Sequence, residues 1–323
     1  MLKGMIGVIL LNLGGPDAPA AVKPFLYNLF SDRDIIKLGP RLLQKPLAGL
    51  IAHVRAPKTT AMYQKIGGGS PILPITKAQA EALAGQLRTD APGTAFAIDV
   101  GMRYWHPFIA DTVGCMYDLG VRRFIGLNLY PQYSVATSGS SLKALKQALS
   151  SRRDCFVAEA GSWHLHPKYL DALAFSIQTS VSSFADRPVV LFSAHSLPQS
   201  FIDAGDPYLA QTQETVRALT SRLSLDSRLS FQSRSGPVKW LEPSTEQMLQ
   251  TLAREGVRNL LVVPISFVSD HIETLYEIDI EYQEIAHRSG MTMKRMPSLN
   301  TAPLFIEALA DIVLTTAKER NWL

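Results

Sequence analysis

Short hydrophobic runs alternate with amphipathic stretches along the whole chain. The runs predict strands at 6–12, 95–100, 123–129, 156–159, 188–192, 228–232, 259–265 and 292–295. Apolar residues recur at helical spacing in 76–87, 107–119, 141–149, 169–181, 207–223, 244–255, 271–287 and 303–318. Such alternation predicts an α/β fold in which helices cover both faces of parallel sheets.

The two halves open alike, each with an apolar strand, then small polar residues, then a proline. Eight strands could form one sheet or two sheets of four. The repeated opening favours two Rossmann-like domains, each a four-stranded parallel sheet. We assign 1–165 and the last helix, 302–323, to the first domain and 166–301 to the second; periodicity alone does not place the last helix.

Composition narrows the class of protein. With 323 residues, 46% of them hydrophobic and 19% charged, the chain is a folded globular protein. A net charge of +4 without a dense Lys/Arg block gives no reason to expect a nucleic-acid partner. The only two cysteines, Cys115 and Cys155, exclude a disulfide framework and a cysteine-rich metal site and indicate a reducing compartment. No apolar run reaches the length of a membrane-spanning helix.

An acidic segment follows the seventh predicted strand. On an α-helix, Glu273, Glu277 and Glu281 would stand one turn apart on one face. Carboxylates stacked in this way repel one another, so either a passing cation or passing protons would explain them; a solvated acidic face is the alternative. His271 adds an imidazole, and this ligand mixture suits iron, nickel, copper or zinc better than magnesium.

Polar and aromatic residues gather where the strands end, which is where open α/β sheets bind ligands. His195 directly follows the fifth strand and could be structural, a proton acceptor or a metal ligand. A mixed aromatic and basic set suits a large planar ligand that carries carboxylates: Tyr63, Lys65, Arg103, Tyr104, Trp105, Tyr130, Tyr133 and Trp240. The glycine-rich turns at 13–16 and 67–70 match no phosphate-binding motif, and no nucleophile elbow occurs, which disfavours nucleotide enzymes and hydrolases.

The segment 40–58 is apolar on one side and carries Arg41, Lys45, Arg55 and Lys58. It predicts either a packed helix pair broken at Pro46 or a lip that touches a membrane surface.

Seven motifs in one order resemble those of the ferrochelatases, enzymes that insert ferrous iron into a porphyrin at the end of haem synthesis. They are LNLGGP at 11–16, YQKIGGGSPI at 63–72, MRY at 102–104, YPQYS at 130–134 with GSS at 139–141, FSAHSLP at 192–198, Gly236-Pro237 with Trp240, and 269–282.

The resemblance implies chelatase-type domains with a porphyrin cleft between them and protoporphyrin IX and Fe²⁺ as substrates. It implies that His195, Glu273 and His271 serve metal insertion, with His195 and Glu273 facing the metal and with Glu277 and Glu281 forming an acidic path. The residues implied to bind the porphyrin are Leu13, Lys65, Arg103, Tyr104, Tyr130 and Trp240. We assign His195 as proton acceptor and expect it to face Glu273 across a slot wide enough for a flat tetrapyrrole.

The chain departs from the animal enzymes in having no C-terminal cysteine. We therefore expect no [2Fe–2S] cluster, no permanently bound cofactor and a monomeric, bacterial-type enzyme. It would be cytoplasmic, with peripheral contact at the inner membrane through 40–58. The alternatives are a chelatase for another tetrapyrrole, such as coproporphyrin III or a cobalt corrin precursor, and a porphyrin or haem carrier without catalysis.

Overall fold

The computed structural model describes residues 4–323, which divide into two compact units. The first comprises the described residues up to Ser162 together with Ile306–Leu323, and the second is Trp163–Phe305. Each holds one four-stranded parallel sheet, in the order β2-β1-β3-β4 in the first unit and β6-β5-β7-β8 in the second. The predicted α/β fold with two such sheets is confirmed.

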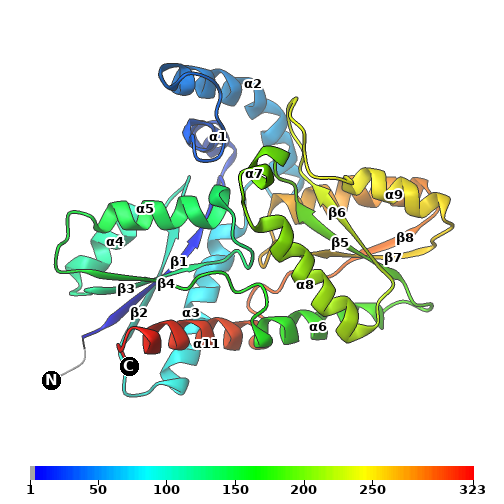
Figure 1. Cartoon of the computed structure of the whole chain (residues 1–323). Coiled ribbons are helices and arrows are strands. Elements are labelled where there is room, and N and C mark those ends of the chain that lie inside the picture. The colour runs from blue at the N-terminus through cyan, green and yellow to red at the C-terminus, as the bar shows by residue number, and fades with distance from the viewer. Residues whose placement is uncertain (1–3) are drawn as a thin grey trace. The chain divides into compact units, whose positions relative to one another are not determined.

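The first unit is built on β1 (Ile6–Asn12), every residue of which is buried between its two neighbouring strands. The other strands are β2 (Phe96–Met102), β3 (Arg123–Asn128) and β4 (Phe156–Glu159). Helices α4 (Ile109–Asp118) and α5 (Ser140–Leu149) pack an apolar cluster against one face of the sheet. Helix α3 (Ile72–Asp90) and most of α11 (Pro303–Glu319) lie on the other face (Figure 1).

The second unit repeats this plan around β5 (Val189–His195). Its other strands are β6 (Ser227–Gln232), β7 (Asn259–Pro264) and β8 (Thr292–Arg295). One face is covered by α9 (Thr245–Arg254), a π-helix (Glu273–Tyr282) and α10 (Gln283–Arg288), whose apolar residues form a core with β5 and β7. Helices α6 (Pro167–Val181) and α8 (Tyr208–Leu223) cover the other face, and the short α7 (Gln199–Asp203) lies between β5 and α8 in the chain (Figure 1).

The segment 40–58 differs from its predicted form. It is not broken at Pro46, because a short 3₁₀ turn (Arg41–Leu43) leads into one continuous helix, α2 (Gln44–Lys65). Pro46 stands in the first turn of α2, where a missing N–H removes no helical hydrogen bond. The preceding helix α1 (Val22–Ser31), which packs on α2, was not predicted, since prolines interrupt the apolar pattern at its start.

No helix within residues 4–323 combines the length and the apolar character needed to cross a membrane. The two sheets position the site instead: in each unit, loops that carry polar side chains leave the carboxyl ends of the central strands.

Candidate active site

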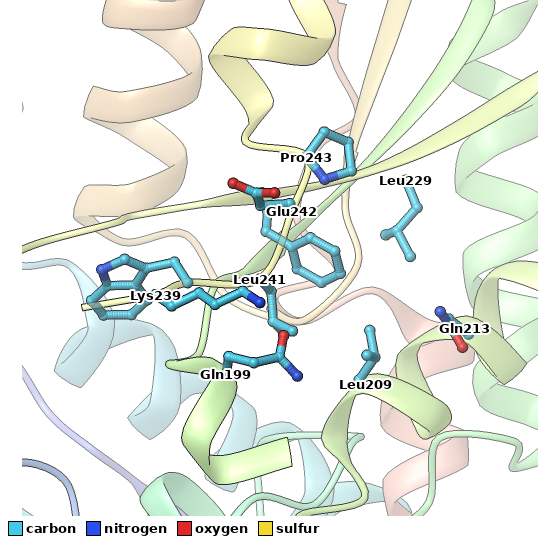
Figure 2. Close-up of a pocket in the computed structure, with 10 residues that line it drawn as sticks. Gln199, Leu209, Gln213, Leu229, Lys239, Leu241, Glu242 and Pro243 are labelled. Carbon is cyan, nitrogen blue, oxygen red and sulfur yellow. The ribbon is translucent and has the colours of Figure 1, made fainter. Parts of the chain in front are cut away.

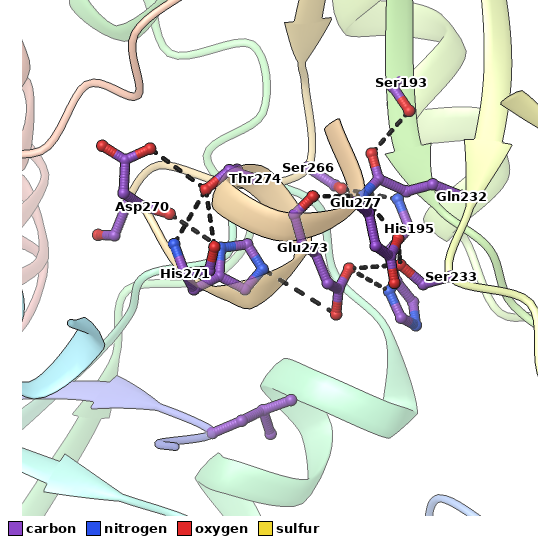
Figure 3. A network of polar contacts seen from close by, with 12 residues as sticks. Ser193, His195, Gln232, Ser233, Ser266, Asp270, His271, Glu273, Thr274 and Glu277 are labelled. Carbon is purple, nitrogen blue, oxygen red and sulfur yellow. Dashed lines mark hydrogen bonds and ion pairs between the residues drawn. The ribbon is translucent and has the colours of Figure 1, made fainter. Parts of the chain in front are cut away.

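His195 and Glu273 meet at the carboxyl edge of the second sheet (Figure 3). His195 is the last residue of β5, and Glu273 is the first residue of the π-helix. Nδ1 of His195 lies 2.8 Å from Oε2 of Glu273, and the two side chains are 34% and 19% exposed. An imidazole on a rigid strand end is thus paired with a carboxylate at a helix start.

The two groups change each other's pKa. Burial of His195 opposes its protonation, but the negative charge and hydrogen bond of Glu273 outweigh burial and raise the pKa of the imidazole above its usual value. Burial of Glu273 opposes ionisation, yet the charge of His195 and its hydrogen bond lower the pKa of the carboxyl to about 2. Both shifts favour an ion pair.

Ser233, which the sequence analysis did not single out, joins this pair to a second carboxylate (Figure 3). Its Oγ lies 2.8 Å from Oε2 of Glu273 and 2.6 Å from Oε2 of Glu277. The backbone of Ser233 has φ of 65°, in the left-handed region that a non-glycine residue seldom occupies. A hydroxyl has one proton to donate. Of the two carboxyls, one must therefore carry a proton of its own.

Glu277 is the group that holds this proton. Burial, followed by the negative charge of Glu273, raises the pKa of Glu277 to about 8. The amide of Gln232 approaches the same carboxyl, with Nε2 3.2 Å from Oε2 of Glu277. Ser193 in turn donates to Oε1 of Gln232 at 2.7 Å, so the acidic pair rests on buried polar side chains of the sheet.

The helix that carries the carboxylates is a π-helix, where an α-helix was expected. A π-helix closes i→i+5 hydrogen bonds in place of the i→i+4 bonds of an α-helix. Glu277 shares Ser233 with Glu273. Burial, followed by the negative charge of Glu281, raises the pKa of Tyr276. A role of Glu277 and Glu281 in an acidic path stays a prediction.

His271 flanks Glu273 on the side away from His195 (Figure 3). Its Nε2 lies 4.0 Å from Oε1 of Glu273, and its Nδ1 lies 3.1 Å from the backbone oxygen of Ser269. Burial lowers the pKa of His271, because it penalises the charged ring more than Glu273 favours it. A neutral imidazole and an ionised carboxylate, side by side, are groups that a divalent iron ion accepts as ligands.

Asp270 fixes the start of the acidic segment. Its carboxylate accepts hydrogen bonds from Arg295 at 2.9 Å, Ser298 at 2.8 Å and Asn300 at 2.8 Å. These contacts anchor the residue next to His271 to the loop after β8. The Asp270 carboxylate is thus already occupied by structural partners.

The expected slot between His195 and Glu273 is absent, since a 2.8 Å contact leaves no room for a macrocycle between them. The pair therefore faces a ligand as one unit. Within residues 4–323, no three or more His, Cys, Asp or Glu side chains form an arrangement that could hold a metal ion.

Comparison with known proteins decides the class. The family model described as ferrochelatase matches residues 5–317. A ferrochelatase of Geotalea daltonii is 52% identical over 317 residues, which cover 97% of this chain and 98% of the relative. A ferrochelatase of Synechocystis is 47% identical over 325 residues, with coverage of 98% and 84%.

The chain belongs to the ferrochelatase family. Ferrochelatases insert ferrous iron into a porphyrin in haem biosynthesis, and the chain is an enzyme of this kind.

Solved structures show the same chelatase-type fold at low sequence identity. SirB from Bacillus subtilis with Fe³⁺ aligns with a TM-score of 0.57 and 12% identity, covering 76% of this chain and 91% of SirB. CbiX, the terminal enzyme of sirohaem biosynthesis in denitrifying bacteria, aligns with a TM-score of 0.51 and 11% identity, covering 96% and 98%. At these identities the likeness concerns the fold alone.

The residues expected to bind the porphyrin fall in both units of this ferrochelatase. In the second unit, Trp240 follows the loop of Ser233, and the segment that it begins pairs with the residues after His195 through Leu241, whose N–H donates to the Leu197 oxygen at 3.0 Å. Trp240 and Phe231 line a cavity of about 440 Å³. Figure 2 shows this cavity with its neighbours Lys239 and Leu241. Trp240 is thereby tied to the strand that carries His195.

In the first unit, Tyr130 and Leu13 lie together. The Tyr130 hydroxyl donates to Oδ1 of Asn12 at 2.6 Å and accepts the Leu13 N–H at 3.1 Å. Gly14 follows with φ of 85°, a conformation that favours glycine and turns the chain sharply after β1. The structure thus brings two of the predicted porphyrin contacts together at the end of the central strand.

Arg103 and Tyr104 form a separate cluster around Asp32. Arg103 Nη2 and the Tyr104 hydroxyl each lie 2.6 Å from Oδ2 of Asp32, and Ser140 donates to the same oxygen at 3.0 Å. Tyr104 is almost fully buried in this cluster. Lys65 is the exposed last residue of α2. Porphyrin contact by these three residues stays a prediction.

Proposed function

We propose that this ferrochelatase uses protoporphyrin IX, that His195 takes protons from its pyrrole nitrogens, and that Glu273 with His271 receives Fe²⁺. The observation that supports this most strongly is the chain of contacts from His195 through Glu273 and Ser233 to Glu277. Insertion requires two N–H protons to leave the ring as one divalent cation enters it, so a site needs both a base and an outlet.

His195 is oriented as a base. A carboxylate can only accept, so the contact with Glu273 places a proton on Nδ1 of His195. Within the described residues Nε2 has no hydrogen-bond partner, and the ring is 34% exposed. Neutral His195 therefore offers the lone pair of Nε2 to a ligand that arrives at the sheet edge. Base catalysis of this kind typically contributes 10²–10⁴-fold to a rate.

Ser233 and Glu277 give the protons a way out. A proton on His195 lies one hydrogen bond from Glu273, and Ser233 connects Glu273 to Glu277. Since the pKa of Glu277 is about 8, this carboxyl can hold or release a proton near neutral pH. Each transfer along this chain moves a proton across one hydrogen bond. No buried group therefore has to carry a charge without a hydrogen-bonded partner.

Turnover separates this proposal from its alternatives. Under anaerobic conditions with excess Fe²⁺ and protoporphyrin IX, the Soret band should shift to that of the metallated product for many equivalents per enzyme. A carrier would stop without product formation. The same assay with coproporphyrin III tests the choice of porphyrin, and a higher kcat/KM for coproporphyrin would replace protoporphyrin in this account.

We also propose that the segment 40–58 touches the membrane surface while the enzyme, a cytoplasmic monomer, exchanges its apolar ligand. Four apolar side chains there are exposed: Leu42 at 92%, Leu43 at 50%, Leu50 at 60% and Val54 at 68%. Arg41 and Lys45 lie among them and can face anionic headgroups.

Vesicles that contain anionic lipid test the membrane contact. Arg41→Glu with Lys45→Glu should weaken binding, since each basic residue near such a surface contributes about 1 kcal/mol. Lys77→Glu with Arg88→Glu, on the exposed side of α3, makes the same change of charge elsewhere and should bind more tightly than the first variant. Equal partitioning of the two variants onto the vesicles would exclude membrane contact by the segment 40–58.

A further inference from the structure

At His195, strand β5 no longer has a neighbouring strand on the β7 side. Along β5, alternate residues bond to β6 and to β7: Ser196 donates to the Gln232 oxygen, whereas Ser193 accepts from Ile265. His195 is two residues after Ser193 and so turns its N–H and C=O toward β7. Pairing with β7 ends at Ser193 and Pro264, two residues before His195.

Two side chains replace the missing strand. The N–H of His195 donates to Oγ of Ser266 at 2.9 Å, and the hydroxyl of Tyr208 donates to the His195 oxygen at 2.8 Å. These two contacts satisfy the backbone N–H and C=O of His195, which a longer β7 would otherwise have bonded.

Both replacing side chains are rigidly held. Ser266 is 4% exposed and Tyr208 is 6% exposed, so neither hydroxyl can exchange its partner for bulk water. Tyr208 begins α8, where Oδ1 of Asp206 accepts its backbone N–H at 3.0 Å. The two contacts therefore connect the end of β5 to the start of a long helix and to the turn after β7.

We propose that Tyr208 and Ser266 are positioning residues for metal insertion, which hold the backbone of His195 so that its imidazole keeps its place against Glu273. This inference rests on the proposed role of His195 as the base. Without backbone hydrogen bonds to β7, rotation of the backbone at the end of β5 would displace the imidazole of His195. A displacement of about 1 Å can reduce a rate about 100-fold.

The test compares Tyr208→Phe with Tyr169→Phe. Tyr169 is also fully buried in the second unit, but its hydroxyl has no hydrogen-bond partner among the described residues. Turnover with Fe²⁺ and protoporphyrin IX is normalised to the number of porphyrin-binding sites, measured by fluorescence titration. This correction removes any loss of folded enzyme.

Tyr208→Phe should lower kcat per site about 10- to 100-fold with little change in KM for the porphyrin, while Tyr169→Phe stays within twofold of the parent. Ser266→Ala should cause a similar loss, Ser266→Thr should recover part of it, and Tyr208→Phe with Ser266→Ala should lose less than the product of the single effects. Normal kcat per site in both Tyr208→Phe and Ser266→Ala would overturn the positioning role. If His195→Ala itself turned over normally, the proposed base would fail instead, whatever the other variants did.

Discussion

Glu273 lies between two imidazoles and presents a different oxygen to each. Oε2 of Glu273 is 2.8 Å from Nδ1 of His195, and Oε1 is 4.0 Å from Nε2 of His271. The two rings have opposite shifts of pKa, raised for His195 and lowered for His271. One carboxylate thus lies beside a ring whose protonation it favours and a ring that burial keeps neutral, which fits the roles proposed for His195 and His271.

Glu273→Gln keeps the shape of this side chain and removes its charge. We expect kcat to fall about 100-fold or more. The proposed base His195 would lose its charged partner, and the proposed iron site with His271 would lose its carboxylate. Porphyrin affinity, measured by fluorescence quenching, should change little. A variant with parental kcat would exclude Glu273 from the reaction.

The activity should depend on pH through His195. Because His195 must be neutral to accept a proton and its pKa is raised by Glu273 and Glu277, kcat/KM should rise with pH, with a midpoint above 6.5. Glu273→Gln removes the largest attraction, so the residual activity should show a lower midpoint. A midpoint that stayed fixed in this variant would assign the titration to another group.

Ser233→Ala removes the only hydroxyl that connects Glu273 to Glu277 among the described residues. Charge-assisted hydrogen bonds contribute about 1.5–3 kcal/mol, so a loss of about 10- to 100-fold in kcat is expected. Ala retains the same strain at positive φ as Ser, which isolates the hydroxyl. Ser200→Ala, at an exposed serine of α7, is the control and should be neutral.

Glu277→Gln should affect stability in a direction that depends on pH. A carboxyl whose pKa is raised to about 8 in the folded protein destabilises the fold as pH rises from its unfolded pKa of about 4.5 to about 8. Gln resembles the protonated form. The melting temperature of Glu277→Gln should therefore gain on the parent between pH 5 and 8, and a constant difference across this range would contradict the raised pKa.

The central strands could be predicted because they contain runs of Val, Ile and Leu that the fold buries, as in 6–12 and 259–264. The clustering of His195 with Glu273 could be predicted only as far as both follow central strands. The π-helix could not, since Glu273, Glu277 and Glu281 have the spacing of an α-helix and the widened turn depends on tertiary contacts.

Ser233, Tyr208 and Ser266 escaped the sequence analysis for a shared reason. A serine or tyrosine is common in any chain, so its presence alone predicts no role. The roles here depend on backbone geometry, namely φ of 65° at Ser233 and pairing with β7 that ends two residues before His195. Hydrophobic periodicity does not show where one strand stops pairing with its neighbour. Such residues become visible only when the hydrogen bonds of the backbone are followed to their partners.

The most direct test of the account is a single-turnover experiment on the His195→Ala variant. Enzyme saturated with protoporphyrin IX is mixed with Fe²⁺ under anaerobic conditions, and the Soret band is followed by stopped flow. In this variant, porphyrin should bind with nearly parental affinity, and metallation should slow by about 100-fold or more. Metallation at the parental rate would contradict the assignment of His195 as the group that takes the protons.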